Sequence, residues 1–402
     1  EQIRRLPFTT ADELQQAGME MVCVSQAEIA RVVTLDTSGT TGAPKRLYFT
    51  HADQELTVDF FQHGMSTFTR PGQRVLVLLP FERPGSVGDL LAAGLRRMQA
   101  EPVLYGPVRD PQHTLALIQE HRIDGLVGSP AHVLALARGS TRWPGAWRPG
   151  WALLSIDRVP AAAAAAIADA WGCAVYNHYG MTEMGLGGGV DCQARAGYHL
   201  READLYVELI DPASGEPAAP GAPGEVVFTT LTRQGMPLVR YRTGDESRWL
   251  AQPCACGTQL HTLAHVQRRL AGQVDLLPGG AAQPGEAWGA AAARPAGSGA
   301  ARLGIEDLDE ALFALPGVLN FSAVLSGDRR QARLELALEL LPGAPGDWPA
   351  QAAAALEELP ALQAARRAGR LALQVTGQSY PGPLAGSLAK RKIVDRRRLI
   401  NA

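Results

Sequence analysis

Apolar runs alternate with longer mixed stretches over the first half of the chain. The run Val75 to Leu79 is apolar at every position, which is typical of a parallel strand buried on both faces. Further short strands are predicted at Pro102 to Tyr105, Gly125 to Gly128, Ala152 to Ile156 and Ala174 to Asn177. Helices are predicted between them at Asp53 to Gly64, Gly88 to Met98, Thr114 to His121, Ala131 to Ala137 and Ala161 to Trp171. This order predicts an alternating α/β fold.

Two regions depart from this alternation. Near the start, a Gly/Thr loop from Thr37 to Pro44 separates a strand at Arg31 to Leu35 from a second strand at Leu47 to Thr50. Further on, Asp204 to Ile210 and Glu225 to Thr230 predict a β-rich region. We therefore expect a large domain that contains several sheets.

The composition changes sharply near residue 277. Residues 277–301 are almost entirely Ala, Gly and Pro, which favours a linker or a mobile loop. Beyond it, a helix is predicted from Ile305 to Leu315, followed by strands at Val318 to Leu325, Ala332 to Leu340 and Leu371 to Thr376 and by a helix at Ala350 to Arg367. The sequence predicts a large N-terminal domain at residues 1–272 and a smaller, mobile α+β domain at residues 273–402.

Composition and charge narrow the class of protein. A chain of 402 residues exceeds the size of one hydrophobic core, and 46% apolar residues exclude a disordered protein. Lys plus Arg (38) nearly equals Asp plus Glu (40), so nothing favours nucleic acid or a membrane as partner. The first residues lack the apolar stretch of a signal peptide, which favours a cytoplasmic location. The chain begins at Glu1 rather than Met, so we expect native residues to precede it.

The loop between the first two strands is the strongest chemical signal. Its glycines allow successive main-chain N–H groups to face an anion, and its hydroxyls and ammonium group can bind phosphate oxygens. The Lys is not followed by Ser or Thr, so this is not the P-loop of common NTPases. The alternative is an ordinary polar turn. The candidate phosphate-binding residues are Thr37, Ser38, Gly39, Thr40, Thr41, Gly42 and Lys45.

Four ordered segments carry a resemblance to a known superfamily. They are Ser38 to Lys45, Tyr179 to Glu183, Tyr241 to Asp245 and Lys390 to Lys392. In this order they resemble the adenylate-forming (AMP-binding) superfamily of acyl-CoA ligases, peptide synthetase adenylation domains and luciferases. The chain is most similar to phenylacetate-CoA ligases, through Leu6 to Thr10, Gly224 to Leu231 and Cys254 to Gly257.

The resemblance implies a role for each matching residue. Glu183 would hold Mg²⁺, and Thr182 would hydrogen-bond the α-phosphate of ATP. Asp245 would accept both ribose hydroxyls, and Tyr179 would pack on adenine, with Gly180 and Met181 in the same nucleotide-binding segment. Taken alone, Asp245 would be interpreted as a turn-capping residue.

The basic C-terminal segment offers the catalytic lysine. The resemblance implies that Lys390 reaches the reacting carboxylate and phosphate, with Lys392 as the alternative assignment. A solvated basic face is the alternative for the whole segment. The hinge is expected at residues 273–275, where Gln273 replaces the family's ribose-contacting Arg. Residues 155–158 stand where the family places an adenine-contacting segment.

Cysteine and histidine residues form a second candidate site. Cys192, His199, Cys254 and Cys256 supply three thiols and one imidazole, a donor set suited to tetrahedral Zn²⁺. Buried free cysteines are the alternative. Cys23 and Cys173 are expected in the core, and His178 either lines the acyl pocket or is a core residue.

The function implied is a two-step ligase reaction. ATP and a carboxylic acid, expected to be aryl or otherwise apolar, would give an acyl-adenylate, and coenzyme A would then displace AMP. A non-CoA acceptor and a nucleotide-binding, non-catalytic protein are the alternatives. The expected cofactors are ATP/AMP, Mg²⁺, CoA as co-substrate and structural Zn²⁺. The sequence is compatible with a homodimer.

Overall fold

The chain folds into two compact units. The computed structural model describes residues 2–35, 44–141, 145–277, 301–328, 331–344, 346–379 and 391–397. The first unit comprises Glu1–Gly106, Asp124–Val127 and Tyr176–Val266, and the second comprises Pro107–Ile123, Gly128–Val175 and Gln267–Ala402. The division of the chain at residues 272 and 273 stays a prediction.

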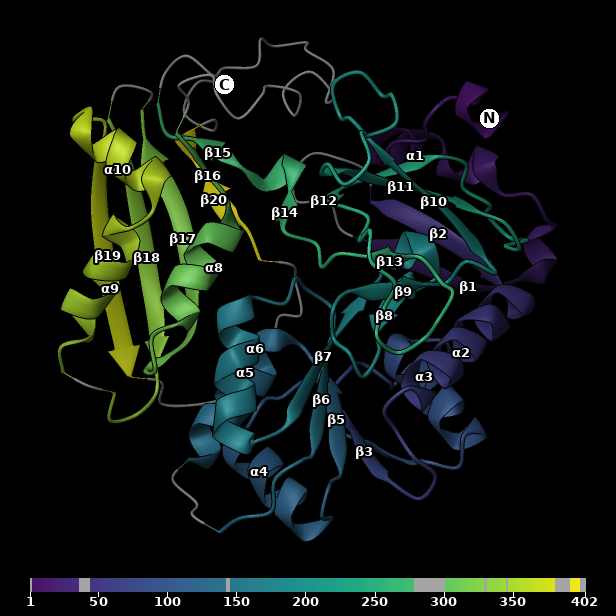
Figure 1. Cartoon of the computed structure of the whole chain (residues 1–402), viewed down its shortest axis with the longest axis horizontal. Helices are drawn as coiled ribbons and strands as arrows, with labels where there is room; N and C mark the ends of the chain where they lie inside the picture. The colour runs from purple at the N-terminus through teal and green to yellow at the C-terminus, as the bar shows by residue number, and fades with distance from the viewer. Residues whose placement is uncertain are drawn as a thin grey trace. The chain divides into compact units, whose positions relative to one another are not determined.

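The first unit contains the parallel strands that the apolar runs predict. β3 pairs in parallel with both β4 and β5, and its residues Val75 to Val77 are fully buried. α2 begins at a capping box in which Thr50 and Asp53 bond each other's main-chain N–H groups, and it packs beside α3 (Figure 1). These elements are α2 (His51–Ser66), α3 (Val87–Arg97), β3 (Arg74–Val77), β4 (Glu101–Leu104) and β5 (Gly125–Gly128).

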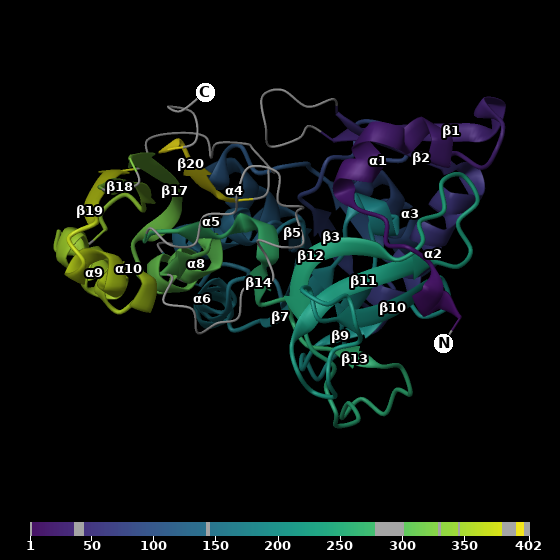
Figure 2. The same ribbon diagram turned by 90° about the horizontal axis from the view of Figure 1, so that it is seen from above.

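Antiparallel strands make up the rest of the first unit. β1 and β2 form the predicted pair on either side of the Gly/Thr loop, and β10, β11 and β12 form the curved sheet visible in Figure 2. β8 pairs with β7 and β9, and β9 pairs with β13. The bounds are β1 (Ile29–Leu35), β2 (Lys45–Thr50), β7 (Ala174–Tyr179), β8 (Gly189–Asp191), β9 (Tyr198–Leu200), β10 (Leu205–Ile210), β11 (Gly224–Thr230), β12 (Tyr241–Ser247) and β13 (Thr262–Leu263). Short helices are η1 (Ile3–Arg5), α1 (Ala11–Ala17), η2 (Gly18–Met21), η3 (Gln26–Glu28) and η4 (Thr182–Met184).

One hydrophobic cluster joins these antiparallel strands. Leu47, Phe228 and Leu263 are completely buried within it, and Tyr179 and Tyr241 contribute their rings. The hydroxyl groups of both tyrosines bond carboxylates, so the edge of this core is also the wall of a polar site.

The second unit contains a small α+β region. Its sheet has the order β19-β18-β17-β20, and α8, α9 and α10 lie on one face of it (Figures 1 and 2). The bounds are α4 (Pro111–Glu120), α5 (Pro130–Ser140), β6 (Trp151–Leu154), α6 (Ala161–Trp171), β14 (Arg268–Arg269), η5 (Leu270–Gly272), β15 (Val274–Asp275), β16 (Arg302–Leu303), α8 (Ile305–Phe313), β17 (Val318–Gly327), β18 (Ala332–Leu340), α9 (Trp348–Glu357), α10 (Pro360–Arg367), β19 (Leu371–Ser379) and β20 (Ile393–Asp395).

The structure corrects one predicted helix. The stretch from Ala350 to Arg367 forms two helices, because Pro360 cannot donate the main-chain hydrogen bond that a continuous helix needs. Pro360 instead starts α10, where a missing N–H costs nothing. The mixed α/β fold itself is confirmed. Within the described residues, no helix combines the length and apolar character needed to cross a membrane.

Candidate functional site

A tight turn after β7 presents the carboxylate of Glu183. The chain leaves the strand at Tyr179 and forms the short helix η4, whose last turn closes with a hydrogen bond from the N–H of Gly185 to the carbonyl of Thr182. Gly185 has a φ of 72°, a left-handed conformation that favours glycine. The main chain at Thr182 and Glu183 therefore has a fixed conformation after the strand.

Two side chains contact the carboxylate of Glu183, a residue that is only 6% exposed. Lys45, the first residue of β2, forms an ion pair with its Oε1. Tyr241, the first residue of β12, donates a hydrogen bond to the same oxygen over 3.1 Å. The Lys45 ammonium also lies 3.4 Å from the Tyr241 hydroxyl. β2, η4 and β12 thus meet at one carboxylate.

Burial and the carboxylate of Glu183 together act on the pKa of Tyr241. Burial is the main cause that raises the pKa of Tyr241, and the negative charge of Glu183 raises it further. Tyr241 therefore stays protonated and acts as a donor. The Lys45 ammonium and the Tyr241 hydroxyl stabilise the negative charge, which makes the site suitable for a cation or for phosphate recognition.

Asp245 lies beside Tyr179, the last residue of β7. The Tyr179 hydroxyl donates to Asp245 Oδ2 over 3.1 Å, and the Tyr179 ring stacks on Tyr198 with centroids 5.4 Å apart. Asp245 is 2% exposed. Residues predicted separately from two motifs are therefore in direct contact.

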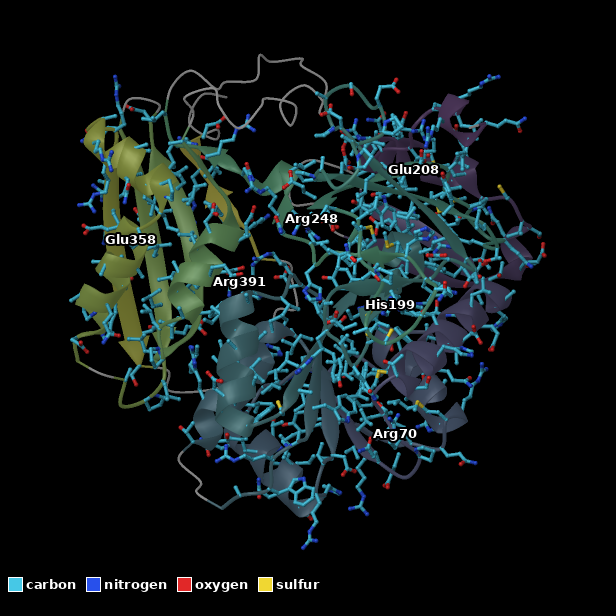
Figure 3. The ribbon with its side chains drawn as sticks, viewed as in Figure 1. Arg70, His199, Glu208, Arg248, Glu358 and Arg391 are labelled. Atoms are coloured by element: carbon cyan, nitrogen blue, oxygen red, sulfur yellow. The ribbon has the colours of Figure 1, made fainter. Side chains whose placement is uncertain are left out.

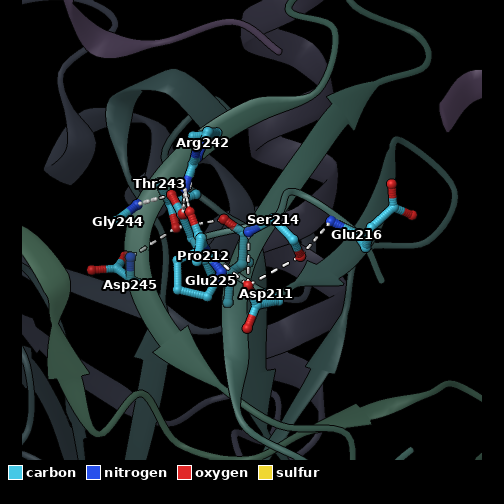
Figure 4. A network of polar contacts seen from close by, with 11 residues as sticks. Asp211, Pro212, Ser214, Glu216, Glu225, Arg242, Thr243, Gly244 and Asp245 are labelled. Carbon is cyan, nitrogen blue, oxygen red and sulfur yellow. Dashed lines mark hydrogen bonds and ion pairs between the residues drawn. The ribbon is translucent and has the colours of Figure 1, made fainter. Parts of the chain in front are cut away.

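A network of hydrogen bonds holds the turn that carries Asp245 (Figure 4). The Thr243 hydroxyl donates to the carbonyl of Val226 over 2.7 Å and accepts from the N–H of Asp245 over 3.0 Å. Glu225 accepts from the N–H of Gly244 over 3.1 Å and forms an ion pair with Arg242. β11 therefore fixes the turn in β12 from the neighbouring strand.

The predicted cysteine and histidine residues also come together. Their ligand atoms all lie within 4.8 Å of one another, although Cys192 follows β8, His199 is in β9 (Figure 3) and Cys254 and Cys256 belong to the loop before β13. The sulfurs of Cys192 and Cys254 are 3.5 Å apart, and Cys256 Sγ is 3.4 Å from His199 Nε2.

The protonation of this cluster is set by burial and by main-chain donors. Burial raises the pKa of the Cys192 thiol to about 11 and lowers the pKa of His199, so both are neutral near pH 7. The N–H of Thr258 lowers the pKa of Cys256. Thr262 Oγ1 lies 3.3 Å from His199 Nδ1, which leaves Nε2 directed at the sulfurs. Of the other cysteines, Cys173 is buried as predicted, but the prediction for Cys23 was wrong because it is exposed.

Comparison with known proteins identifies the family of the chain. The sequence pattern of AMP-binding enzymes matches residues 16–232, more than half of the chain. The chain belongs to the AMP-binding enzyme family.

Individual relatives extend this result. A phenylacetate-coenzyme A ligase of Thermus thermophilus is 30% identical over 268 residues, which cover 64% of this chain and 58% of that ligase. One of Aromatoleum evansii is 28% identical over 256 residues, covering 62% and 57%. This AMP-binding enzyme therefore aligns with less than two thirds of the length of these relatives. A crystal structure of 2-hydroxyisobutyryl-CoA ligase in complex with R3-HIB-AMP matches 99% of this chain and 82% of that one, with a TM-score of 0.72 and 21% identity, which shows a shared fold.

Not every predicted residue of this AMP-binding enzyme can be placed. Residues 37–42 and Lys390 lie outside the described residues, so their roles stay predictions. Arg391, which follows Lys390, donates its main-chain N–H to Asp157 over 3.0 Å and pairs with Asp309 at 2.7 Å (Figure 3). Lys392, the alternative assignment, is exposed.

Sequence reasoning missed two contributors to the site. Tyr241 stands within a quoted motif, but only the structure shows its hydroxyl against Glu183. Arg233, between two predicted strands, donates to the main-chain carbonyl of Glu183 over 2.6 Å. No local pattern could have pointed to Arg233, because its partner is distant in the chain.

The Thr243 network predicts the effect of one substitution. Thr243→Val keeps the shape of the side chain but removes both hydrogen bonds of its hydroxyl. We expect a loss of about 1–3 kcal/mol in the free energy of unfolding, measured by urea denaturation, and weaker binding of AMP, measured by calorimetry. Thr232→Val is the matched control, since the Thr232 hydroxyl bonds Asp204 in an exposed position. Equal AMP binding by Thr243→Val and wild type would contradict the inference that these hydrogen bonds hold Asp245 in place for nucleotide binding.

Proposed function

We propose that this enzyme uses ATP to activate a carboxylic acid as an acyl-adenylate and transfers the acyl group to coenzyme A. The observation that carries the proposal is a pair of hydrogen bonds between β7 with its following turn and β12. Tyr241 of β12 donates to Glu183, and Tyr179 of β7 donates to Asp245 of β12. One carboxylate is suited to a metal ion and the other to ribose hydroxyls. A nucleoside triphosphate is the ligand that needs both carboxylates, one for its metal ion and one for its ribose.

The first step joins two anions. A substrate carboxylate oxygen attacks the α-phosphorus of ATP, the bond from that phosphorus to the bridging oxygen breaks, and pyrophosphate leaves with the electron pair. The residues must hold the two reactants in line and neutralise their charge. Lys45 and residues 37–42 would bind phosphate oxygens, Thr182 the α-phosphate and Asp245 the ribose, while Tyr179 would pack on adenine together with Gly180 and Met181.

Glu183 would hold Mg²⁺. The site fits a cation, because the buried carboxylate already has the Lys45 ammonium against it. When bound, Mg²⁺ would neutralise phosphate charge and orient the leaving pyrophosphate. The Lys45 side chain would then be released from Glu183 toward the phosphates, so that positive charge is conserved around the carboxylate.

The second step releases AMP. The thiol sulfur of coenzyme A attacks the acyl carbon, the thiol proton passes to solvent, and the bond from the acyl carbon to the AMP phosphate oxygen breaks. A rotation of the C-terminal domain about residues 273–275 would exchange the adenylation lysine, Lys390, for the thiol. Such an exchange of active-site walls is a known kind of domain motion.

The acid is proposed to be aryl or otherwise apolar. The His178 imidazole lies beside the rings of Phe60 and Phe61, with centroids 5.9 and 6.2 Å away. Burial lowers the pKa of His178 to about 4, so the imidazole stays neutral and adds no charge that would attract a second carboxylate. The phenylacetate-coenzyme A ligases among the relatives support the same class of acid.

The proposal is tested by measuring pyrophosphate release from Mg-ATP with a panel of aryl and aliphatic acids, each with and without coenzyme A. We expect turnover that depends on both an aryl or apolar acid and coenzyme A. Glu183→Gln should lower the rate by about 10²–10³, because it removes the charge that holds the metal ion. Full activity of this variant would contradict the role of Glu183.

The C-terminal lysine has its own test. Lys390→Ala should lose adenylation by a factor of about 10²–10³ and keep the conversion of a supplied acyl-adenylate to the thioester. Lys392→Ala is the matched control and should keep both half-reactions. A reversed result would assign the role to Lys392, and equal loss of both half-reactions in Lys390→Ala would refute it.

One observation favours an alternative acceptor or a non-catalytic protein. Gln273 replaces an expected arginine, and its side chain is engaged in a hydrogen bond with Glu306. Without this arginine, the enzyme would bind the nucleotide more weakly. Acyl-adenylate formation without CoA-dependent AMP release would indicate another acceptor, and ATP binding without turnover would indicate the non-catalytic alternative.

We propose in addition that Cys192, His199, Cys254 and Cys256 bind a structural Zn²⁺. In tetrahedral zinc sites the ligand atoms lie roughly 3.3–3.8 Å from one another, given Zn–S and Zn–N distances of about 2.3 and 2.0 Å. The separations of 3.5 and 3.4 Å in the cluster fit this geometry. Four protein ligands leave no open position, so the ion would be structural. Binding would deprotonate the thiols against the effect of burial on Cys192.

Metal analysis tests the zinc proposal. Protein purified without added zinc should contain close to one equivalent, and a Cys254→Ser, Cys256→Ser variant should contain none and unfold at lower temperature. Cys173→Ser is the control, because that buried cysteine lies outside the cluster. A fully folded wild type without metal would refute the proposal.

A further inference from the structure

Arg233 lies in the connection between β11 and β12 and takes no part in the chemistry proposed above. The residue is half-buried, but its guanidinium group is directed inward. Burial lowers the pKa of Arg233 to about 10, so the group stays charged at neutral pH. An inward, charged guanidinium is costly to desolvate unless it has defined partners.

The partners of Arg233 belong to the adenylation site. Its guanidinium donates to the main-chain carbonyl of Glu183 over 2.6 Å. It also lies over the ring of Phe49, with 5.0 Å from Cζ to the ring centre. Phe49 is on β2, the strand that begins at Lys45. Arg233 therefore links the two chain segments whose side chains, Lys45 and Glu183, form the ion pair.

The connection that carries Arg233 is itself fixed. Both residues that follow Arg233 donate their main-chain N–H groups to Asp53, over 2.7 Å from Gln234 and 2.9 Å from Gly235. Asp53 is 3% exposed and belongs to the first turn of α2. The negative charge of Asp53 also favours the charged form of Arg233. Hydrogen bonds thus hold both the main chain that carries Arg233 and the guanidinium group at the end of its side chain.

The same helix fixes the end of η4. Thr57, one turn further along α2, donates its hydroxyl to the carbonyl of Gly185 over 2.8 Å. A Cβ atom at Gly185 would lie 2.8 Å from a terminal nitrogen of Arg233. Glu183 therefore has its main chain held by Arg233 on one side and, two residues later, by α2 on the other.

We propose that Arg233 is a positioning residue for Glu183. It fixes the main chain of η4 through the Glu183 carbonyl, so that the carboxylate faces Lys45, Tyr241 and the incoming metal ion. The inference rests on the proposed function, because Glu183 must hold Mg²⁺ for the positioning to affect the rate. A group that orients a metal-binding residue without touching the metal typically affects metal affinity or activity by 10–100-fold.

Three variants separate positioning from stability. Arg233→Met removes the charge and the hydrogen bond but keeps much of the apolar bulk against Phe49. Arg233→Lys keeps the charge and a donor. Arg240→Met is the matched control. Arg240 is more deeply buried than Arg233 and pairs with Glu208, but it too donates to main-chain carbonyls, those of Arg4 and Leu6, and lies over an aromatic ring, Phe8 at 4.0 Å.

The first measurement is pyrophosphate release as a function of Mg²⁺ concentration at saturating ATP and acid. For Arg233→Met we expect the Mg²⁺ concentration at half-maximal rate to rise about 10–100-fold, with partial recovery in Arg233→Lys. Arg240→Met should lower the unfolding temperature and leave the Mg²⁺ dependence unchanged. An unchanged Mg²⁺ dependence in Arg233→Met, with an active wild type, would overturn the proposal.

The second measurement does not depend on turnover. In wild type, the N–H groups of Met184 and Gly185 bond carbonyls within the turn, so hydrogen exchange there reports its order. Arg233→Met should exchange faster in the peptide that contains η4, and Arg240→Met should not. Equal protection in all three proteins would overturn the positioning role. An inactive wild type with faster exchange in Arg233→Met would instead refute the proposed function alone.

Discussion

The buried negative charge of Glu183 is the constraint on which the rest of the first unit depends. A carboxylate at this depth is tolerated only when cations and donors replace the water that it has lost. Lys45 and Tyr241 supply these groups, and they come from β2 and β12. The two strands must therefore reach the end of β7 in a fixed position, and the hydrophobic cluster around Phe228 holds them there. Core packing and site chemistry are in this way one arrangement, since displacing either strand would leave the charge without compensation.

How far the sequence predicts the fold depends on how local the determining interactions are. The apolar run at β3 and the Ala-rich α6 are set by their own residues, and both were predicted at or near their observed bounds. The break at Pro360 was locally encoded too, but the strong helix-forming composition on both sides obscured it. β20 was missed altogether. Its three residues, Ile393–Asp395, stand in a basic segment, and they form a strand only because β17 offers a parallel partner.

Prediction of the site also depended on how local its interactions are. Tyr179, Glu183 and Asp245 were predicted from motif likeness. The structure brings Tyr179 into direct contact with Asp245, and Tyr241 of the second motif into contact with Glu183 of the first. Their neighbours were beyond prediction where the contact joins distant segments. Arg233 reaches Glu183 across 50 positions of sequence, so neither residue carries a local sign of the other. The cysteine cluster was predictable for a different reason. Thiols and imidazoles are rare enough that a set of four suggests a shared ligand without any knowledge of the path between them.

The cysteine cluster and the nucleotide site are connected through Asp191, which directly precedes Cys192. One oxygen of this buried carboxylate accepts the main-chain N–H of Asn177 over 2.8 Å, and the other lies 2.7 Å from Nε2 of His265. Asn177 is in β7, two residues before Tyr179, whose hydroxyl bonds Asp245. Loss of order around Cys192 would therefore reach the carboxylate of Asp245 through one strand. A closed metal site remote from the reacting atoms would in this arrangement support catalysis by fixing the strand from which the nucleotide-binding residues extend.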